Sequence, residues 1–331
     1  MPDQIKTHGA AAGDNELPAH LYDREARFVA NDESLSGSAA DASKVPQKQP
    51  RGLWGEAWAD LRRRPLFWIA SVLILLVVLV ALFPQLFTSV DPTHADLAKS
   101  NGAAEDGHPL GFTKQGYDVY ARVIYGARAS VLTGLGVTIA VTLVGVIVGA
   151  LAGFYGGWLD SILSRITDIF FAIPLILAGI VLMQLFTDRN TLTVIIVLSI
   201  FAWPQMARIT RGAVIEAKQN DYVMASRALG QSRLAILARH VLPNSLAPII
   251  VMATTGLGIY IVAEATLSYL GIGLPAGTVS WGNDISTAQQ SLRTDPMILF
   301  WPASALAVTV LGFIMLGDAL SDALDPKERK R

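Results

Sequence analysis

Long apolar runs dominate the pattern of hydrophobic and polar positions along this chain. Six such runs, each close to the length of about 20 residues that crosses the hydrocarbon core of a bilayer, alternate with polar segments. They predict an all-α polytopic membrane protein. The six predicted transmembrane helices span residues 67–88, 130–153, 166–186, 192–208, 245–270 and 297–316.

Lysine and arginine residues beside these runs orient them. Three arginines at 62–64 precede the first run, and four basic residues at 327–331 follow the last. Six more lie at or after the end of the fourth run and before the fifth, against two acidic residues. The positive-inside rule therefore places both termini in the cytoplasm. Residues 91–129 become an extracytoplasmic loop, in which a surface amphipathic helix would let Arg122 and Arg128 snorkel.

Composition separates the two ends from the membrane core. The chain of 331 residues is 52% hydrophobic, yet residues 1–50 hold few large apolar side chains and predict a disordered cytoplasmic tail. This tail lacks the pattern of a signal peptide, so we expect the first span, within residues 51–90, to stay in the mature protein. Residues 321–331 form a second cytoplasmic tail. A net charge of −1 offers no basic field for nucleic acid, and the lack of cysteine excludes disulfides and thiolate metal sites.

Glycine and proline mark features inside the spans. Gly145, Gly149 and Gly153 recur every four residues, a spacing that lets two membrane helices approach closely. Pro174 and Pro204 lie within predicted spans and favour kinks. Such kinks serve static packing or belong to helices that line a translocation path, and the sequence leaves both open.

One charged stretch, "DYVMASRALGQSRLAILARHVLP" at residues 221–243, separates the fourth and fifth runs. It predicts a short helix that Gly230 stops, then a second helix that Ser232 caps and Pro243 closes. Two interpretations stand side by side. The segment rests on lipid headgroups as an interfacial helix, or its tip projects into a groove of a soluble partner.

This stretch resembles the EAA loop of the permease subunits of ATP-binding cassette (ABC) importers. That loop reads Glu-Ala-Ala, three residues, Gly, nine residues, Ile, one residue, Leu-Pro. Ala225, Gly230, Leu242 and Pro243 match it with the spacing intact, whereas residues 224, 226 and 240 depart from it. The resemblance implies a coupling segment at 216–243 that contacts an ATP-binding subunit. Its expected contact residues are Asp221, Tyr222, Ala225, Arg227, Ala228, Gly230, Leu242 and Pro243.

Further motifs resemble the dipeptide and oligopeptide importer permeases, in particular the member of each permease pair that has an N-terminal anchor helix. They are "HPLG" at 108–111, "RVIYGAR" at 122–128, "GFYGGWLDSILSRITDIFFAIP" at 153–174, "AEATLSYLGIGLP" at 263–275, "SWG" at 280–282 and "LGDALSDALDPK" at 316–327. Phe112 and Tyr117 replace polar and arginine positions of the family in the outer loop. The resemblance implies the type I ABC importer permease fold, with the anchor helix at 51–90 and the permease core at 130–320.

The same resemblance implies partners: a second homologous permease, two ATP-binding subunits and an extracytoplasmic peptide-binding protein, at a bacterial inner membrane. The chain has no Gly-x-x-x-x-Gly-Lys-Ser/Thr phosphate loop, so ATP and magnesium would bind to the partners. Its five histidines show no metal-ligand spacing, and no Gly-x-Ser-x-Gly motif frames a nucleophile. We therefore expect a chain without catalytic residues or a cofactor.

Acidic residues inside the spans carry their own predictions. Glu264, in the fifth span near Ser268, either pairs with a neighbouring helix or makes a polar contact along the translocation path or at its gate. Asp168 is expected to pair with Arg165 at the inner membrane surface.

Several functions stay open beside peptide import. A permease of the same family for nickel, glutathione, haem or sugar fits the same motifs. An ion-driven secondary transporter is a further class, for which Glu264 offers weak support. A membrane scaffold that only anchors an ATPase is the third.

Overall fold

The computed structural model describes residues 53–324, a part of the chain that is helical and contains isolated bridges without a sheet. The predicted tail at 1–50 lies outside the described residues, as does most of the tail at 321–331. Five helices of the described part are long and apolar enough to cross a membrane, and a bent pair supplies a sixth candidate span. They confirm the predicted all-α membrane fold. The five are α3 (Pro65–Leu82), α4 (Val119–Tyr155), α7 (Thr191–Ala217), α11 (Leu246–Tyr269) and α13 (Met297–Leu324), and the pair is α5 (Gly157–Phe171) with α6 (Leu175–Met183).

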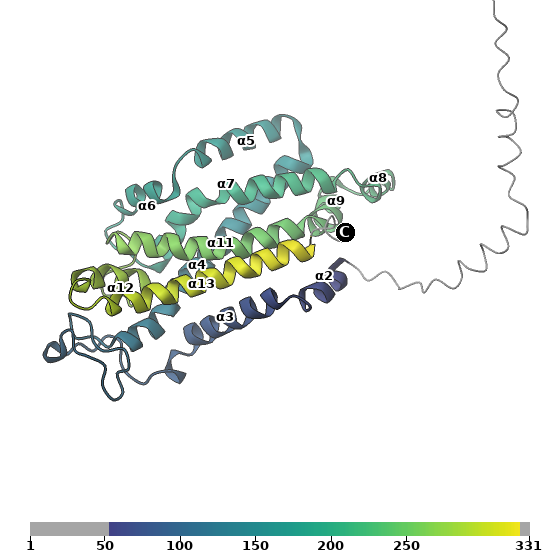
Figure 1. Cartoon of the computed structure of the whole chain (residues 1–331). Coiled ribbons are helices and arrows are strands. Elements are labelled where there is room, and N and C mark those ends of the chain that lie inside the picture. Colours follow the sequence, from purple (N-terminus) through teal and green to yellow (C-terminus); the bar gives the residue numbers. More distant parts are fainter. Residues whose placement is uncertain (1–52, 325–331) are drawn as a thin grey trace, which may run out of the picture. The chain divides into compact units, whose positions relative to one another are not determined.

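Short helices gather at the two ends of the bundle of spans (Figure 1). One end carries α2 (Leu53–Leu61), α8 (Asp221–Ala228) and α9 (Arg233–Ile236), with a π-helical turn (Leu237–Val241) and α10 (Leu242–Asn244) leading into α11. The opposite end carries α12 (Trp281–Ala288) and the segment between α3 and α4. Within residues 53–324, three 3₁₀ turns complete the order, at Pro84–Leu86, Leu97–Lys99 and Gln289–Ser291.

The second span begins earlier than its apolar run predicts. Asp118 caps α4 by accepting a hydrogen bond from the Ala121 amide, so helix replaces the last part of the predicted loop at 91–129. Arg122 does not snorkel at a membrane surface, because its side chain is buried against α12, where it pairs with Asp284. The apolar run does not reveal this first part of α4, because protein rather than lipid covers it.

The third span is two helices and not the single helix predicted at 166–186. Gly156 and Gly157, with φ of 68° and 60°, reverse the chain after α4 and start α5. Pro174 then caps α6, and the axes of α5 and α6 differ by 77°. A proline offers no amide hydrogen, which suits the first turn of a helix better than its interior.

The glycine repeat of α4 packs against α7, which confirms the predicted close helix contact. A Cβ added at Gly149 would lie 2.8 Å from the Thr210 Cβ, and one at Gly153 would lie 2.8 Å from the Arg211 carbonyl oxygen. Larger residues would force the two helices apart. Helix α7 itself continues from Arg208, its predicted end, to Ala217. Buried side chains of α4, α7 and α11 form the main core: Val137, Val141, Val194, Val197, Leu198, Met206, Ile249 and Leu267.

Candidate functional site

The predicted coupling segment folds as two short helices joined by a tight turn, between the C-terminal end of α7 and the N-terminal end of α11. At the end of α8, the Gln231 amide donates to the Ser226 carbonyl at 3.2 Å and the Gly230 amide donates to the Arg227 carbonyl at 3.1 Å. This pair of bonds is the Schellman ending of a helix, which needs a residue with positive φ. Gly230 has φ of 75°, so the glycine is where the backbone requires it.

The second half of the segment starts as predicted and ends differently. Ser232 caps α9 by accepting from the Ala235 amide at 3.3 Å. The predicted single helix up to Pro243 is wrong, because a π-helical turn follows α9 and Pro243 lies inside α10. A proline cannot donate to the carbonyl four residues earlier, and the wider π turn accommodates that loss.

An apolar cluster fixes the segment to the membrane helices. Val223 of α8 and Ile236 of α9 are fully covered, and they pack with Val214 and Ala217 of α7 and Phe154 of α4. Burial of these side chains stabilises the segment by roughly 1.5–3 kcal/mol for each large one. The segment is therefore joined rigidly to α4 and α7 and is not a loose loop.

Most predicted contact residues lie on the free surface of the segment. Two leucines outside the predicted set share this surface: Leu229 is 83% exposed and Leu234 is 64% exposed, one on each side of the Gly230 turn. Leu242 is the exception, since it packs against the apolar cores. The residues that face outward are Asp221, Tyr222, Ala225, Arg227, Ala228, Gly230 and Pro243.

Glu264 and Ser268 lie buried near the C-terminal end of α11. The Ser268 hydroxyl donates to Glu264 Oε1 at 2.8 Å and accepts from the Leu274 amide at 3.1 Å. Glu264 Oε2 has no hydrogen-bond partner within residues 53–324. These bonds tie the end of α11 to the turn that follows it.

Sequence patterns missed a buried ion pair at the same end of the bundle. Arg122 of α4 binds Asp284 of α12, and its guanidinium carbon lies 4.7 Å from the centre of the Tyr117 ring. Tyr117 and Phe112, the two departures from the family pattern, thus help to fold the segment between α3 and α4, the predicted outer segment, and Phe112 is buried there. Burial raises the pKa of Asp284 to about 6, while Arg122 acts to lower it. No local signal joins two residues so far apart in the sequence.

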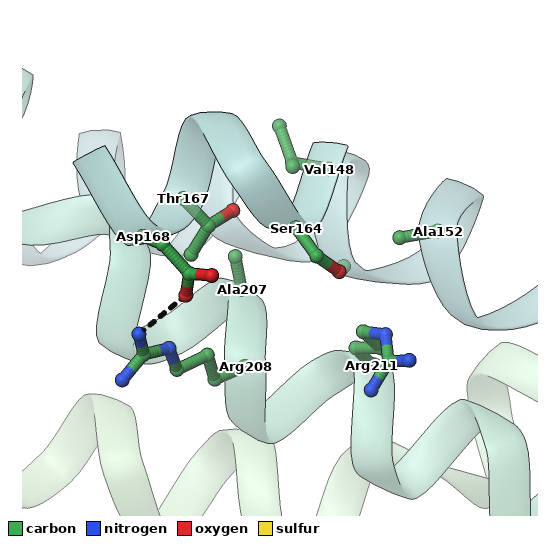
Figure 2. A pocket seen from close by; sticks show the side chains of 9 residues that line it. Val148, Ala152, Ser164, Thr167, Asp168, Ala207, Arg208 and Arg211 are labelled. Carbon is green, nitrogen blue, oxygen red and sulfur yellow. Dashed lines mark hydrogen bonds and ion pairs between the residues drawn. The ribbon is translucent and has the colours of Figure 1, made fainter. Parts of the chain in front are cut away.

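Two further ion pairs lie in the C-terminal part of α7. Asp168 of α5 binds Arg208 at 2.7 Å, so the predicted partner Arg165 is wrong (Figure 2). Asp160 accepts two hydrogen bonds from Arg211, at 2.6 and 2.7 Å. Both carboxylates of α5 bind arginines of α7 because the two helices pack against each other. Across residues 53–324, no group of three or more potential ligand side chains could hold a metal ion.

Comparison with known proteins agrees with this geometry. Residues 145–330 match the family described as binding-protein-dependent transport system inner membrane component, and residues 52–104 match the N-terminal transmembrane domain of oligopeptide transport permease C. The inward-facing MetNI methionine ABC transporter aligns at a TM-score of 0.51 and 20% identity, over 61% of this chain and 96% of that chain. This likeness concerns the fold alone.

Curated relatives cover nearly the whole chain. The oligopeptide transport system permease protein OppC of Bacillus subtilis is 37% identical over 90% of this chain and 97% of its own length. The dipeptide transport system permease protein DppC of Alkalihalophilus pseudofirmus is 35% identical over 83% of this chain and 90% of its own. The glutathione transport system permease protein GsiD of Escherichia coli O157:H7 is 35% identical over 86% and 93%.

These matches confirm the resemblance seen in the motifs, and they agree with a transport component rather than an enzyme. Permeases of this kind work with an ATPase and a binding protein, so this chain is expected to have partners of these two general classes. The chain belongs to the family of binding-protein-dependent transport system inner membrane components, and it is the multi-pass permease of an ABC importer.

Proposed function

We propose that this permease imports di- and oligopeptides, and that residues 216–243 pass the movement of an ATP-binding subunit to the spans. One observation carries the coupling role. The Gly230 turn projects exposed apolar side chains while a buried cluster fixes the same segment to α4 and α7. A rigid tip of this kind transmits a push, whereas a mobile loop would absorb it.

The surface of the tip favours a protein groove over lipid headgroups. Leu229 and Leu234 are exposed beside Arg227 and Arg233, and α8 lies beyond the inner end of α7 (Figure 1). Apolar side chains flanked by charges are typical of a helix that enters a groove of a partner protein. The partners we propose are two ATP-binding subunits, a second homologous permease and an extracytoplasmic peptide-binding protein.

The same surface supports the proposed orientation. Helix α2 and the final turns of α13 lie at the end of the bundle that carries α8 and α9 (Figure 1). If α8 meets a cytoplasmic ATPase, both ends of the described part face the cytoplasm, in agreement with the positive-inside rule. Residues 51–90 then act as the anchor segment and residues 130–320 as the core, and ATP with magnesium stays on the partner subunits.

We propose that Glu264 and Ser268 belong to the outer gate. The hydroxyl of Ser268 links Glu264, on the same helix, to the Leu274 amide beyond its end, so a change in the tilt of α11 would break the bond to Leu274 or move the turn with the helix. This contact supports a role in opening and closing the outer side more directly than a role in touching cargo.

Glutathione is a second candidate ligand. A permease named for glutathione transport is 35% identical to this chain, the same identity as the relative named for dipeptide transport. Glutathione is itself a short peptide, so one path could suit either ligand.

The test is ATP hydrolysis by the complex isolated from membranes through a tag on this chain, with its binding protein added. We expect hydrolysis to rise when the binding protein is loaded with a dipeptide or an oligopeptide. A rise with glutathione alone would favour the second candidate. A gently isolated complex without any ATPase would overturn the proposal and favour an ion-driven transporter.

A further inference from the structure

A cavity of about 440 Å³ lies between α4, α5 and α7, apart from the coupling segment and the outer gate (Figure 2). Small residues of α4 form its floor, and Ser164 and Thr167 of α5 line one side. Arg208 and Arg211 of α7 line the other, with Asp168 at the rim. Its size is that of an ordinary small-ligand site.

The charged groups of this cavity form ion pairs but still have free hydrogen-bonding capacity. Arg208 and Asp168 are about half exposed, at 44% and 51%, and one hydrogen bond joins them. Within residues 53–324, that bond is the only one described from the five N–H donors of Arg208 or to the carboxylate of Asp168. Unused donors and unused acceptors therefore stand side by side.

Two guanidinium groups and two carboxylates stand around the cavity. Arg208 pairs with Asp168 and Arg211 pairs with Asp160, so the site offers both signs of charge. Such an arrangement complements a zwitterion better than a simple anion or cation. The Arg208 guanidinium also lies 3.8 Å from the centre of the Phe171 ring, which holds it at the rim.

The depth of the cavity is that of the inner headgroup layer. Helix α7 starts at Thr191, and Arg208 lies 17 residues further along the helix, or about 26 Å at 1.5 Å for each residue. This distance approaches the roughly 30 Å of the hydrocarbon core. On α5, Trp158 is exposed two residues before Asp160, and tryptophan is enriched at membrane interfaces.

A second, apolar groove of about 360 Å³ lies along the same three helices, nearer the membrane centre. Val144 and Trp203 line it, each four residues from a cavity residue (Val148 and Ala207), and therefore on the same helix faces. Phe170 of α5 closes its side. The two hollows together have a polar inner end and an apolar outer end, the polarity of a lipid of the inner leaflet.

We propose that this groove holds one phospholipid of the cytoplasmic leaflet with an ethanolamine headgroup. Its phosphate accepts hydrogen bonds from Arg208, its ammonium donates to Asp168, and an acyl chain lies along Val144 and Trp203. A choline headgroup carries no N–H to donate, and a glycerol headgroup brings the negative phosphate without an ammonium to face Asp168. The site needs only insertion in a membrane and does not depend on the transported ligand.

The experiment is native mass spectrometry of the complex isolated through a tag on this chain, after exchange into phosphatidylethanolamine, phosphatidylcholine or phosphatidylglycerol. We expect one tightly retained phosphatidylethanolamine. Arg208→Gln should lower retention of phosphatidylethanolamine by about tenfold, the effect of losing one charge-assisted hydrogen bond. Asp168→Asn should reduce the preference for ethanolamine over choline. Arg63→Gln removes an exposed arginine elsewhere and should change neither value.

Two results would overturn the proposal. One is equal retention of the three lipids by the unmodified complex, or retention that Arg208→Gln leaves unchanged. The other is a cross-link from Thr167→Cys to the second permease, which would show that a partner helix fills the groove. The chain has no native cysteine, so such a cross-link would be specific. Arg208→Gln and Asp168→Asn should both assemble normally, since an exposed ion pair contributes little to folding.

Discussion

Arg122 Nε donates to Asp284 Oδ1 at 2.6 Å, which joins the start of α4 to α12 across 162 positions of the sequence. Both side chains are almost fully buried. Asp284 Oδ2 has no hydrogen-bond partner within the described residues, so this carboxylate is only partly compensated. Breaking a buried ion pair from one side typically costs about 3–5 kcal/mol.

Asp284 should make stability depend on pH. Burial raises its pKa to about 6 in the folded protein, above its ordinary value of 3.8, so the folded state binds the proton more tightly. The stabilisation by this group is then full below about pH 4 and is lost as the pH rises through 6. We expect the Tm of the unmodified protein minus that of Asp284→Asn to be larger at pH 4 than at pH 7. The difference should correspond to on the order of 1–3 kcal/mol.

Asp106→Asn, in the exposed outer segment, is the control for this measurement and should keep the pH profile of the unmodified protein. Thermal unfolding in detergent, followed at several pH values, gives both profiles. A Tm difference between the unmodified protein and Asp284→Asn that stays constant from pH 4 to 7 would show that Asp284 keeps its ordinary affinity for the proton.

The contact between α4 and α7 predicts unequal effects of two glycine substitutions. Gly149→Ala places a methyl group 2.8 Å from the Thr210 Cβ and against the backbone of α7, so it should destabilise by about 1–3 kcal/mol. Gly212→Ala meets nothing within 4 Å and should stabilise its helix by roughly 0.5–1 kcal/mol. Detergent unfolding curves of the two variants give the comparison, and equal Tm values would contradict the packing.

Gly230→Val should uncouple ATP hydrolysis from uptake while the protein still inserts. Valine adopts positive φ only under strain, so the Schellman turn and the tip it presents should change. Gly107→Val is the matched control, because Gly107 has φ of 83° in the outer segment, with nothing within 4 Å. Uptake and ATPase rates in proteoliposomes measure the coupling. Uptake by Gly230→Val at the parental rate, in a normally assembled complex, would refute the role of the turn.

Ser268→Ala should destabilise the C-terminal end of α11. It removes the acceptor of the buried Leu274 amide and the donor to Glu264, and each unsatisfied group costs about 1–3 kcal/mol. Ser161→Ala, whose hydroxyl donates to Gly157 on an exposed surface, should stay within about 0.5 kcal/mol of the unmodified protein. Unfolding curves of the two variants measure the loss of stability, and uptake rates measure whether the proposed outer gate still works. Normal stability with altered uptake would instead indicate direct contact with cargo.

Sequence reasoning reached the spans and the turn because both have local causes. A long apolar run is needed wherever a helix contacts lipid, and a glycine such as Gly230 is needed where the backbone has positive φ. The six runs and the turn were therefore predictable from the sequence. Helix that protein covers leaves no such run, which is why the start of α4 and the end of α7 were missed. Ion pairs depend on which helices pack together, and Asp168 therefore binds Arg208 of α7 rather than its neighbour Arg165.

The break at Pro174 bears on how the protein is made. Helix α5 has 15 residues and α6 has 9, or about 22 Å and about 13 Å in length, so neither half crosses the roughly 30 Å of hydrocarbon by itself. During synthesis the third span must enter the membrane with both halves together. Helix α4 precedes the bent span, but α5 also packs on α7, and α6 packs on α7 and α11. The bent span therefore reaches its final shape only after α7 and α11 have followed it into the bilayer.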